Sequence, residues 1–252
     1  MGAGMTGMRR VLITGSTQGV GLAAARAFAG AGCEVIIHGH SADRAEAVAA
    51  ELRDRGGRAE ARAADLTDRA QIAALIAEAG LLDVLVNCAG VVEKAPAAAV
   101  DTAAWAHQMD INLTAPWILA QGFLPGLRAR QGVIVNLASD SALIGTPDAS
   151  VYCASQGALI GLSRALAIEL APLVRVVCIC PGPVATDVPN AAIAPLADRR
   201  GAAPAKAFAP QGRLASTAEV AALILYAASA DAGFATGAVW TLDGGTTAGK
   251  PG

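Results

Sequence analysis

Two side chains on one predicted helix could take part in proton transfer together. Tyr152 and Gln156 lie four residues apart in the stretch VYCASQGALIGLSRALAIEL, which is predicted to be a helix over 151–170. The i, i+4 spacing places both side chains on the same face of that helix. A protonated phenol can give its proton to a developing alkoxide, and a tyrosinate can remove a proton from an alcohol. Tyr152 is therefore a candidate general acid or base, and the neutral amide beside it calls for an explanation.

A glycine-rich turn supplies the second candidate site. The stretch VLITGSTQGVG has the spacing G-x-x-x-G-x-G between a predicted strand and a predicted helix. Gly15 permits a tight turn, Gly19 lets the backbone approach a pyrophosphate, and Gly21 allows close helix–strand packing at the N-terminus of the helix. We therefore predict a dinucleotide site whose phosphate cradle consists of Gly15, Ser16, Thr17, Gln18, Gly19, Val20 and Gly21.

The end of the second predicted strand bears on the choice of dinucleotide. An acidic residue there would bind the ribose 2′-hydroxyl of NAD(H), whereas basic or polar residues accept a 2′-phosphate. In IIHGHSADR the position is Gly39, followed by His40, Ser41 and Arg44, and the nearest carboxylate, Asp43, belongs to the start of a helix. NADP(H) is favoured and NAD(H) stays possible, while the alternative for His40 is an ordinary surface histidine.

The end of the third predicted strand adds two residues to the expected cofactor site. Asp65 and Leu66 stand in AADLTD, directly after that strand. The Asp65 carboxylate could meet the adenine amino group, or it could serve as a turn and cap residue.

The elements that must position these residues alternate in type along the chain. Buried strands are predicted at 9–14, 33–38, 57–64, 81–87, 132–139, 174–180 and 238–243. Helical patterns separate them, including a long one from Asp101 to about Arg130, and Ser41, Thr67 and Ser216 are the expected helix caps. This order predicts one doubly wound, parallel, Rossmann-type sheet in a three-layer α/β/α domain that spans residues 1–252.

One segment departs from the alternation. Residues 184–210 are rich in Pro and Ala and show little strand or helix rhythm. A connection of this length in a compact domain is more often functional than passive, so we expect a substrate lid there.

The composition excludes several classes of protein. The net charge is -2 with no basic run, which argues against nucleic-acid binding and against a polybasic membrane anchor. The apolar stretches are too short or too interrupted for a membrane span or a signal peptide. The five cysteines follow no metal-ligand spacing, and their odd number indicates reduced thiols in a cytoplasmic protein.

The ordered set of motifs closely resembles the short-chain dehydrogenase/reductase family in its single-domain form. The motifs are TGSTQGVG, NCAG from Asn87 to Gly90, INLTAP with Asn112, NLASDS with Ser139, Tyr152 thirteen residues later, PGPVAT from Pro181 to Thr186 and LDGG near the end of the chain. Any one of them is unspecific, but together they span nearly the whole sequence.

The resemblance implies catalytic roles by position. Tyr152 matches the general acid/base of the family, Ser139 the serine that hydrogen-bonds the substrate oxygen, and Asn112 the asparagine that holds a water in the proton relay. Gln156 stands where the family has a lysine that contacts the nicotinamide ribose and lowers the pKa of the tyrosine.

The resemblance also implies further cofactor contacts. Asn87, Ala89 and Gly90 match the segment beside the adenine ribose, although Cys88 replaces a usual second asparagine. The PGPVAT motif contributes Pro181, Gly182, Val184 and Thr186, of which Thr186 matches the threonine that binds the nicotinamide carboxamide. A homotetramer or homodimer built on the long helices that begin near 101 and 151 is also implied.

The glutamine has a quantifiable electrostatic consequence. A unit charge about 5 Å away at an effective dielectric of about 20 interacts by roughly 3 kcal/mol, or about two pKa units. Without that charge Tyr152 stays protonated at neutral pH, which hurts alcohol oxidation more than carbonyl reduction. Lys94 or Lys206 could lean toward the site instead, although solvated surface positions are the expected alternative.

Three functions compete on this sequence. The preferred hypothesis is an NAD(P)(H)-dependent oxidoreductase that interconverts a carbonyl and a secondary alcohol, because Asn112, Ser139 and Tyr152 are all present. The alternatives are a cofactor-binding protein that has lost its chemistry through Gln156, and a non-redox isomerase or lyase with a structural cofactor. The substrate is a small carbonyl or alcohol whose identity the sequence does not specify.

Overall fold

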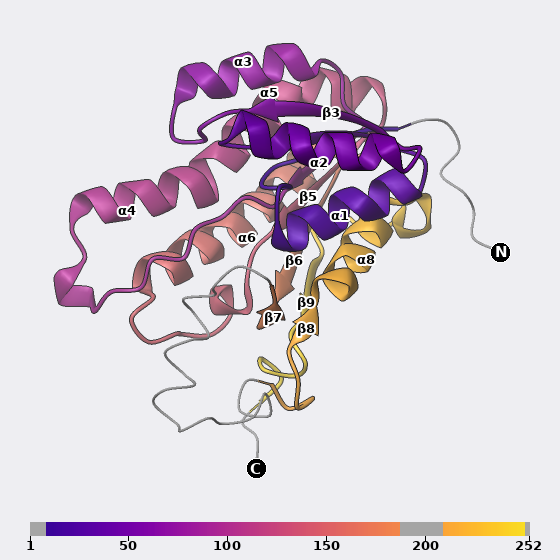
Figure 1. Ribbon diagram of the computed structural model, residues 1–252. Helices are drawn as coiled ribbons and strands as arrows, with labels where there is room; N and C mark the ends of the chain where they lie inside the picture. The colour runs from indigo at the N-terminus through magenta and orange to yellow at the C-terminus, as the bar shows by residue number, and fades with distance from the viewer. Residues whose placement is uncertain (1–8, 187–208, 250–252) are drawn as a thin grey trace.

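The computed structural model describes residues 9–186 and 209–249. A seven-stranded parallel sheet forms its centre, in the order β3-β2-β1-β4-β5-β6-β9 (Figure 1). The strands are β1 (Arg10–Ile13), β2 (Glu34–Gly39), β3 (Arg58–Ala63), β4 (Val84–Asn87), β5 (Val133–Leu137), β6 (Arg175–Pro181) and β9 (Val239–Leu242). A small second pair joins β7 (Val184–Ala185) to β8 (Ala215–Ser216). The predicted doubly wound, Rossmann-type α/β fold is confirmed, and every predicted strand is present.

Helices cover both faces of this sheet. The helices are α1 (Gly19–Gly30), α2 (Ala42–Asp54), α3 (Arg69–Ala79), α4 (Thr102–Met109), α5 (Ala115–Ala129), α6 (Ser150–Leu170) and α8 (Thr217–Ala228). Helices α1, α2 and α8 pack on one face, and α3, α5 and α6 pack on the other (Figure 1).

The alternation of side chains within each strand explains this arrangement. Val11 and Ile13 of β1 point into the core under α1, whereas Leu12 between them points into the core under α3 and α5. All three are fully buried. A strand covered on both faces reads as a continuous apolar run, which is why these strands could be located from the sequence.

Two of the three predicted caps are confirmed. Ser41 caps α2 and Ser216 caps α8, where Ser216 and Glu219 form a reciprocal capping box. The prediction for Thr67 was wrong, because the cap of α3 is Asp68, whose carboxylate accepts from the backbone N–H groups of Ala70 and Gln71. A carboxylate one residue later competes successfully with the threonine hydroxyl for the free amides of the first turn.

The long helical pattern from 101 to 130 is interrupted. A π-helical turn, η2 (Asp110–Thr114), separates α4 from α5. Pro116 follows two residues later and has no N–H to donate to the carbonyl of Asn112, so the regular hydrogen-bond ladder cannot continue through this point. The interruption places Asn112 at a wide turn, with its side chain 1% exposed.

The register of the sheet brings the predicted site together. Ile13 at the end of β1 pairs with Ile37 of β2 and with Val86 of β4, and Asn87 pairs with Asn136 of β5. The loops that follow these strands therefore leave the sheet at one edge. Strand order reverses between β1 and β4, and ligands of open α/β sheets bind at this kind of switch point.

Helix α6 carries Tyr152 and Gln156. It is long and apolar enough to cross a membrane by length and composition alone. Its inner face is nevertheless packed against β6, and Gln156 on it is 3% exposed. Core helices of parallel sheets have the same composition, so packing explains its apolar character.

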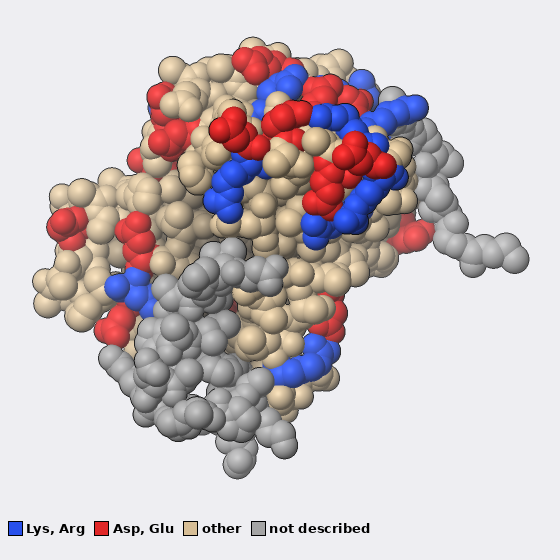
Figure 2. All heavy atoms as spheres, in the orientation of Figure 1, with Lys and Arg blue, Asp and Glu red and all other residues tan. Residues whose placement is uncertain are grey.

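Charged side chains gather away from that helix. In Figure 2, arginine side chains interleave with aspartate and glutamate over α1, α2 and α3, where residue pairs such as Arg26–Glu51 form ion pairs. Mixed signs at close spacing produce no single-sign field. The predicted lid lies almost entirely outside the described residues.

Candidate active site

A cavity of about 690 Å³ opens at the carboxyl edge of the sheet. Its walls come from the loops after β1, β2, β3, β4 and β5, and from α4, α6 and β7. Thirteen of the predicted site residues line it, namely Gly15, Thr17, Gln18, Gly19, Val20, Gly21, Gly39, His40, Asp65, Leu66, Ala89, Gly90 and Thr186. Tyr152 and Gln156 line it as well. The structure thus brings together residues that are up to about 170 positions apart in the sequence.

The glycine cradle has the geometry that a bound pyrophosphate requires. Gly15 and Gly19 have φ angles of +66° and +54°, which favour glycine. A Cβ on Gly15 would lie 2.8 Å from the Cα of Ala89, and a Cβ on Gly21 would lie 2.3 Å from the carbonyl oxygen of Gly15. These positions admit no side chain, so the backbone itself forms the wall of the cavity.

The cradle is fixed to the next loop by a single hydroxyl group. The buried Thr14 Oγ1 accepts hydrogen bonds from the backbone N–H groups of Cys88 and Ala89, both at 3.0 Å. Helix α1 begins beside it, and the Gln18 side chain at its N-cap makes no capping hydrogen bond. The first-turn amides of α1 therefore face the cavity as donors for an anion.

The side of the cavity near β2 carries a basic residue, and Gly39 supplies no carboxylate there. A Cβ on Gly39 would lie 2.7 Å from Cγ2 of Thr17. Arg44 lines the same wall, and its guanidinium donates to Oε1 of Gln18 at 3.2 Å. This is the place where a carboxylate would bind a ribose 2′-hydroxyl.

Several predicted cofactor residues instead use their side chains within the fold. Ser16 Oγ donates to the carbonyl of Ile13 and accepts from the N–H of His38, so it ties β1 to β2. Asn87 Nδ2 donates to Oδ1 of Asn136 at 2.8 Å. Both side chains are buried, and Oδ1 of Asn87 has no hydrogen-bond partner among the described residues.

Four more of the predicted cofactor residues do not line the cavity. Ser41 is occupied as the cap of α2, and Val184 belongs to the buried core. Pro181 and Gly182 lie at the end of β6 against β9, where the N–H of Gly182 donates to the carbonyl of Leu242. Of the PGPVAT motif, Thr186 reaches the cavity.

Asp65 keeps both of its predicted possibilities. Its Oδ1 accepts from the N–H and the hydroxyl of Thr67, each at 2.8 Å, and these hydrogen bonds lower the pKa of the carboxyl group. The same residue lines the cavity. It is a turn residue whose position also suits contact with a ligand.

Some lining residues were not predicted from the sequence. The main ones are His38, Ala64, Cys88, Val91, Val92, His107, Ile111, Leu137 and Ala138. Apolar residues in loops carry no signal of this kind, but the histidines could have been noticed. Burial lowers the pKa of His38 to about 4, and its Nδ1 accepts from the N–H of Gly15. Burial also raises the pKa of Cys88 to about 12, which leaves an unreactive thiol.

Tyr152 and Ser139 lie close together although they belong to different elements. Ser139 precedes the 3₁₀ turn η3 (Asp140–Ala142), and Tyr152 lies in the first turn of α6. Burial raises the pKa of Tyr152 to about 12, a hydrogen bond with Ser139 lowers it in part, and the Asp140 carboxylate raises it further. Tyr152 is therefore fully protonated at neutral pH and suited to donate a proton.

Asn112 is held rigidly beside this pair. Its Nδ2 donates to the carbonyl of Val91 at 2.9 Å and to Oγ of Ser155 at 3.1 Å, and its Oδ1 accepts from the N–H of Val91. The π-turn makes these contacts possible. The asparagine links the loop after β4 to α6.

Gln156 provides a direct test of whether the cavity suits a cofactor. Its Oε1 is buried and has no hydrogen-bond partner among the described residues. A buried polar atom without a partner costs free energy unless a ligand satisfies it. A ribose hydroxyl could donate to this oxygen, and together with the cradle the residues present fit a nicotinamide dinucleotide.

Neither lysine replaces the missing charge in the described structure. Lys94 is placed in the loop after β4 but does not line the cavity, and Lys206 lies outside the described residues. The ammonium group that the family places beside the tyrosine has no counterpart in the described wall of this cavity.

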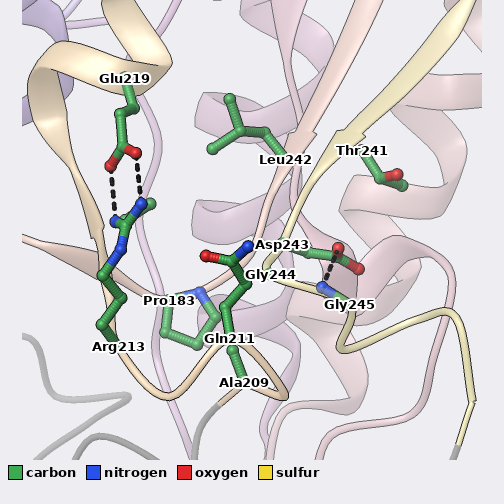
Figure 3. A pocket seen from close by; sticks show the side chains of 11 residues that line it. Pro183, Ala209, Gln211, Arg213, Glu219, Thr241, Leu242, Asp243, Gly244 and Gly245 are labelled. Atoms are coloured by element: carbon green, nitrogen blue, oxygen red, sulfur yellow. Dashed lines mark hydrogen bonds and ion pairs between the residues drawn. The ribbon is translucent and has the colours of Figure 1, made fainter.

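A second cavity, of about 480 Å³, lies on the far side of Asp243. Figure 3 shows that its charges are paired within the protein: the Arg213 guanidinium contacts both carboxylate oxygens of Glu219, and Asp243 accepts from the N–H of Gly245. It does not contain Tyr152, which lines the larger cavity, and Ser139 lines neither of the two. The larger cavity is therefore the candidate active site.

Comparison with known proteins agrees with this assignment. The sequence model of the family described as enoyl-(acyl carrier protein) reductase matches residues 15–247. The chain is 39% identical over 247 residues to cis-4-hydroxycyclohexanecarboxylate dehydrogenase of Sinomonas cyclohexanicum, with 95% of this chain and 97% of the relative covered.

Solved structures show the same fold in full. One, from Beutenbergia cavernae, is described as an NAD(P)-dependent gluconate 5-dehydrogenase with bound NADP; it has a TM-score of 0.90 and 36% identity, and the match covers 98% of this chain and 100% of that one. Another, a 3-oxoacyl-[acyl-carrier protein] reductase from Brucella melitensis with bound NAD, has a TM-score of 0.85 and 30% identity over 96% of this chain and 92% of that one. With its glycine cradle and Tyr152 at one cavity, the chain belongs to the short-chain dehydrogenase/reductase family and is an NAD(P)-dependent oxidoreductase that acts on CH–OH groups.

Proposed function

We propose that this enzyme works chiefly as an NADPH-dependent reductase of a small carbonyl compound. The observation that carries the proposal is the environment of Tyr152, whose pKa burial raises to about 12. At pH 7 a tyrosine with that pKa is ionised in roughly one molecule in 10⁵. The donor form needed for reduction is thus abundant, and the base needed for oxidation is scarce.

The chain's own residues would share the work of the reaction. The glycine cradle and the first turn of α1 would hold the pyrophosphate, and Gln156 would accept from a ribose hydroxyl. When bound, the nicotinamide supplies the hydride for the carbonyl carbon. Ser139 would hydrogen-bond the carbonyl oxygen, and Tyr152 would give that oxygen its proton.

The preference for NADPH rests on the wall near β2. Gly39 supplies no carboxylate at this wall, while Arg44 and His40 line the cavity there. A guanidinium group binds a 2′-phosphate by charge-assisted hydrogen bonds. Solved relatives include one with bound NADP and one with bound NAD, so the family alone does not decide between the two cofactors. The preference is therefore argued from Gly39, His40 and Arg44.

The test is a turnover assay on a panel of ketones and keto acids with either cofactor. We expect reduction with a higher kcat/KM for NADPH than for NADH, and Arg44→Gln should remove most of this difference. Tyr152→Phe should reduce kcat by about 10²- to 10⁴-fold, the usual contribution of a general acid, while NADPH still binds in a fluorescence titration. Reduction that survives in Tyr152→Phe, or its absence across the panel, would refute the proposal.

We also propose that the enzyme assembles as a homodimer or homotetramer through α5 and α6. Both helices leave apolar side chains exposed, and Trp117 is 44% and Ile168 81% exposed. A groove of about 340 Å³ between the two helices is lined partly by Leu124, Leu166 and Leu170. Exposed apolar patches of this kind mark interaction surfaces. A cytoplasmic location is consistent with the five free cysteines.

A further inference from the structure

A carboxyl group stands directly behind the catalytic serine. Asp140 is the first residue of the turn η3, and the Ser139 hydroxyl donates to its Oδ1 at 3.1 Å. The family resemblance implies roles for Ser139 and Tyr152 but none for Asp140. Ser139 lies next to Asp140, and the phenol of Tyr152 lies near both residues.

In the structure the Ser139 hydroxyl donates to Asp140, and it must turn away from Asp140 to donate to a carbonyl oxygen. It has one proton and two lone pairs. The proton is directed to Asp140, one lone pair accepts from the N–H of Ser141 at 3.2 Å, and the other is available to the Tyr152 hydroxyl. Ser139 thus lies between the two groups, hydrogen-bonded to Asp140 and close enough to the Tyr152 phenol to affect its pKa.

The other route for a proton from the tyrosine is weakened in this protein. Gln156 is a neutral amide, which can accept or donate a hydrogen bond but does not change its charge near neutral pH. Asn112 uses Nδ2 and Oδ1 on Val91 and Ser155. Among Ser139, Asn112, Gln156 and Asp140, Asp140 is the residue that readily gains and loses a proton.

We propose that Asp140 is the proton store for Tyr152 and exchanges its proton through the hydroxyl group of Ser139. In reduction, Tyr152 gives its O–H proton to the substrate alkoxide as hydride arrives at carbon. The Ser139 O–H bond then breaks toward the phenolate oxygen, and the carboxylic acid of Asp140 restores the proton to Ser139 Oγ. Solvent reprotonates Asp140, so each turnover consumes one proton, and oxidation runs the same transfers in reverse.

The surroundings of Asp140 suit this role. Burial raises the pKa of the Asp140 carboxyl group, and the Asp243 carboxylate acts in the same direction. The groups that face it are Asp243 beyond β9, Cys180 on β6 and Tyr152 on α6, and none of these three carries a positive charge. A protonated carboxyl group would be accessible closer to neutral pH than for an ordinary aspartate.

The inference rests on the proposed function, and it predicts whether Asp140→Asn makes alcohol oxidation slower or faster. Asn in place of Asp140 can still accept from Ser139, but it cannot exchange a proton. Removing the carboxylate also removes a charge that raises the pKa of Tyr152, so electrostatics alone would make the oxidation of an alcohol faster at neutral pH. A proton store predicts the opposite result.

The experiment compares wild type, Asp140→Asn, Gln156→Lys and the double variant in both directions across pH. We expect Asp140→Asn to lose at least about tenfold in kcat for oxidation and reduction and to lose the acidic limb of the pH profile. Gln156→Lys in the Asp140→Asn background should recover much of that loss, because it opens a second route for the proton.

A parallel titration follows the tyrosine itself. The chain has two tyrosines, so Tyr226→Phe leaves Tyr152 as the reporter in an absorbance titration. Its pKa should fall in Asp140→Asn. Oxidation that is unchanged or faster in Asp140→Asn, or a loss that Gln156→Lys does not rescue, would overturn this inference alone. A wild type without any turnover would overturn the proposed function and this inference with it.

Discussion

At the scale of single residues, the replacement of a lysine by Gln156 defines the chemistry. The amide is buried with its Oε1 unpartnered, which suits a ribose hydroxyl but supplies no charge to Tyr152. The residue types of this site were predictable, because the spacing of Ser139, Tyr152 and Gln156 is visible in the sequence. The role of Asp140 was not, since contact between neighbours in a turn depends on rotamers that no spacing rule specifies.

Gln156→Lys should therefore shift the enzyme toward oxidation. A charge about 5 Å from the phenol at a dielectric of about 20 is worth roughly two pKa units, so the limb of the oxidation profile that reports Tyr152 should move to lower pH by about that amount. The measurement is kcat for an alcohol against pH. Gln156→Met has a similar length without charge and serves as the control; an equal shift in this variant would contradict the electrostatic explanation.

At the scale of elements, the strands and the glycine loop followed from the sequence. Continuous apolar runs such as VLI at 11–13 specify strands buried on both faces, and the loop glycines specify a backbone wall. The π-turn at Asp110–Thr114 could not be read from the pattern, because apolar residues continue through it. The sequence likewise did not show that the side chains of Ser16 and Asn87 hydrogen-bond within the fold, since residues at strand ends can point into the cavity or into the sheet.

The buried His38 in strand β2 should make the stability of the fold depend on pH. The His38 side chain is buried and neutral, with a pKa lowered from 6.5 to about 4. Between these values the unfolded chain binds a proton that the folded protein does not, so stability falls as pH falls through this window. The loss approaches about 3 kcal/mol near pH 4. Denaturant unfolding at several pH values should show this loss in wild type and a smaller one in His38→Gln.

The matched control for this experiment is His40→Gln, two residues further along. His40 is exposed and is the smallest of the causes that act on the pKa of His38, so its replacement should change the pH dependence far less than His38→Gln does. A variant at His38 that unfolds with the unchanged pH dependence would show that other groups cause the acid sensitivity.

At the scale of the whole molecule, charge and apolar surface are separated. Charged side chains, several of them ion-paired, cover α1, α2 and α3 (Figure 2), whereas α5 and α6 expose Trp117 and Ile168. Composition could exclude a nucleic-acid surface, but it could not locate an apolar face, because the outward side of a helix is known only once its inner side is packed.

Trp117→Glu should break the proposed assembly. A buried carboxylate in an apolar interface is costly, so the sedimentation coefficient should fall to that of a smaller species while the circular dichroism spectrum is retained. Leu81→Glu, at a residue that is 54% exposed in the turn before β4, is the control and should leave the assembly intact. A monomeric wild type would contradict the proposed interface.

The hydroxyl of Thr14 has one more consequence. It holds the N–H groups of Cys88 and Ala89 while its own residue begins the glycine loop, so two loops that border different parts of the cavity share one anchor. A ligand that occupies only the adenosine portion would immobilise both loops together. Part of the ordering cost for the nicotinamide end would then already be met before that end arrives, and the two halves of the dinucleotide would bind cooperatively.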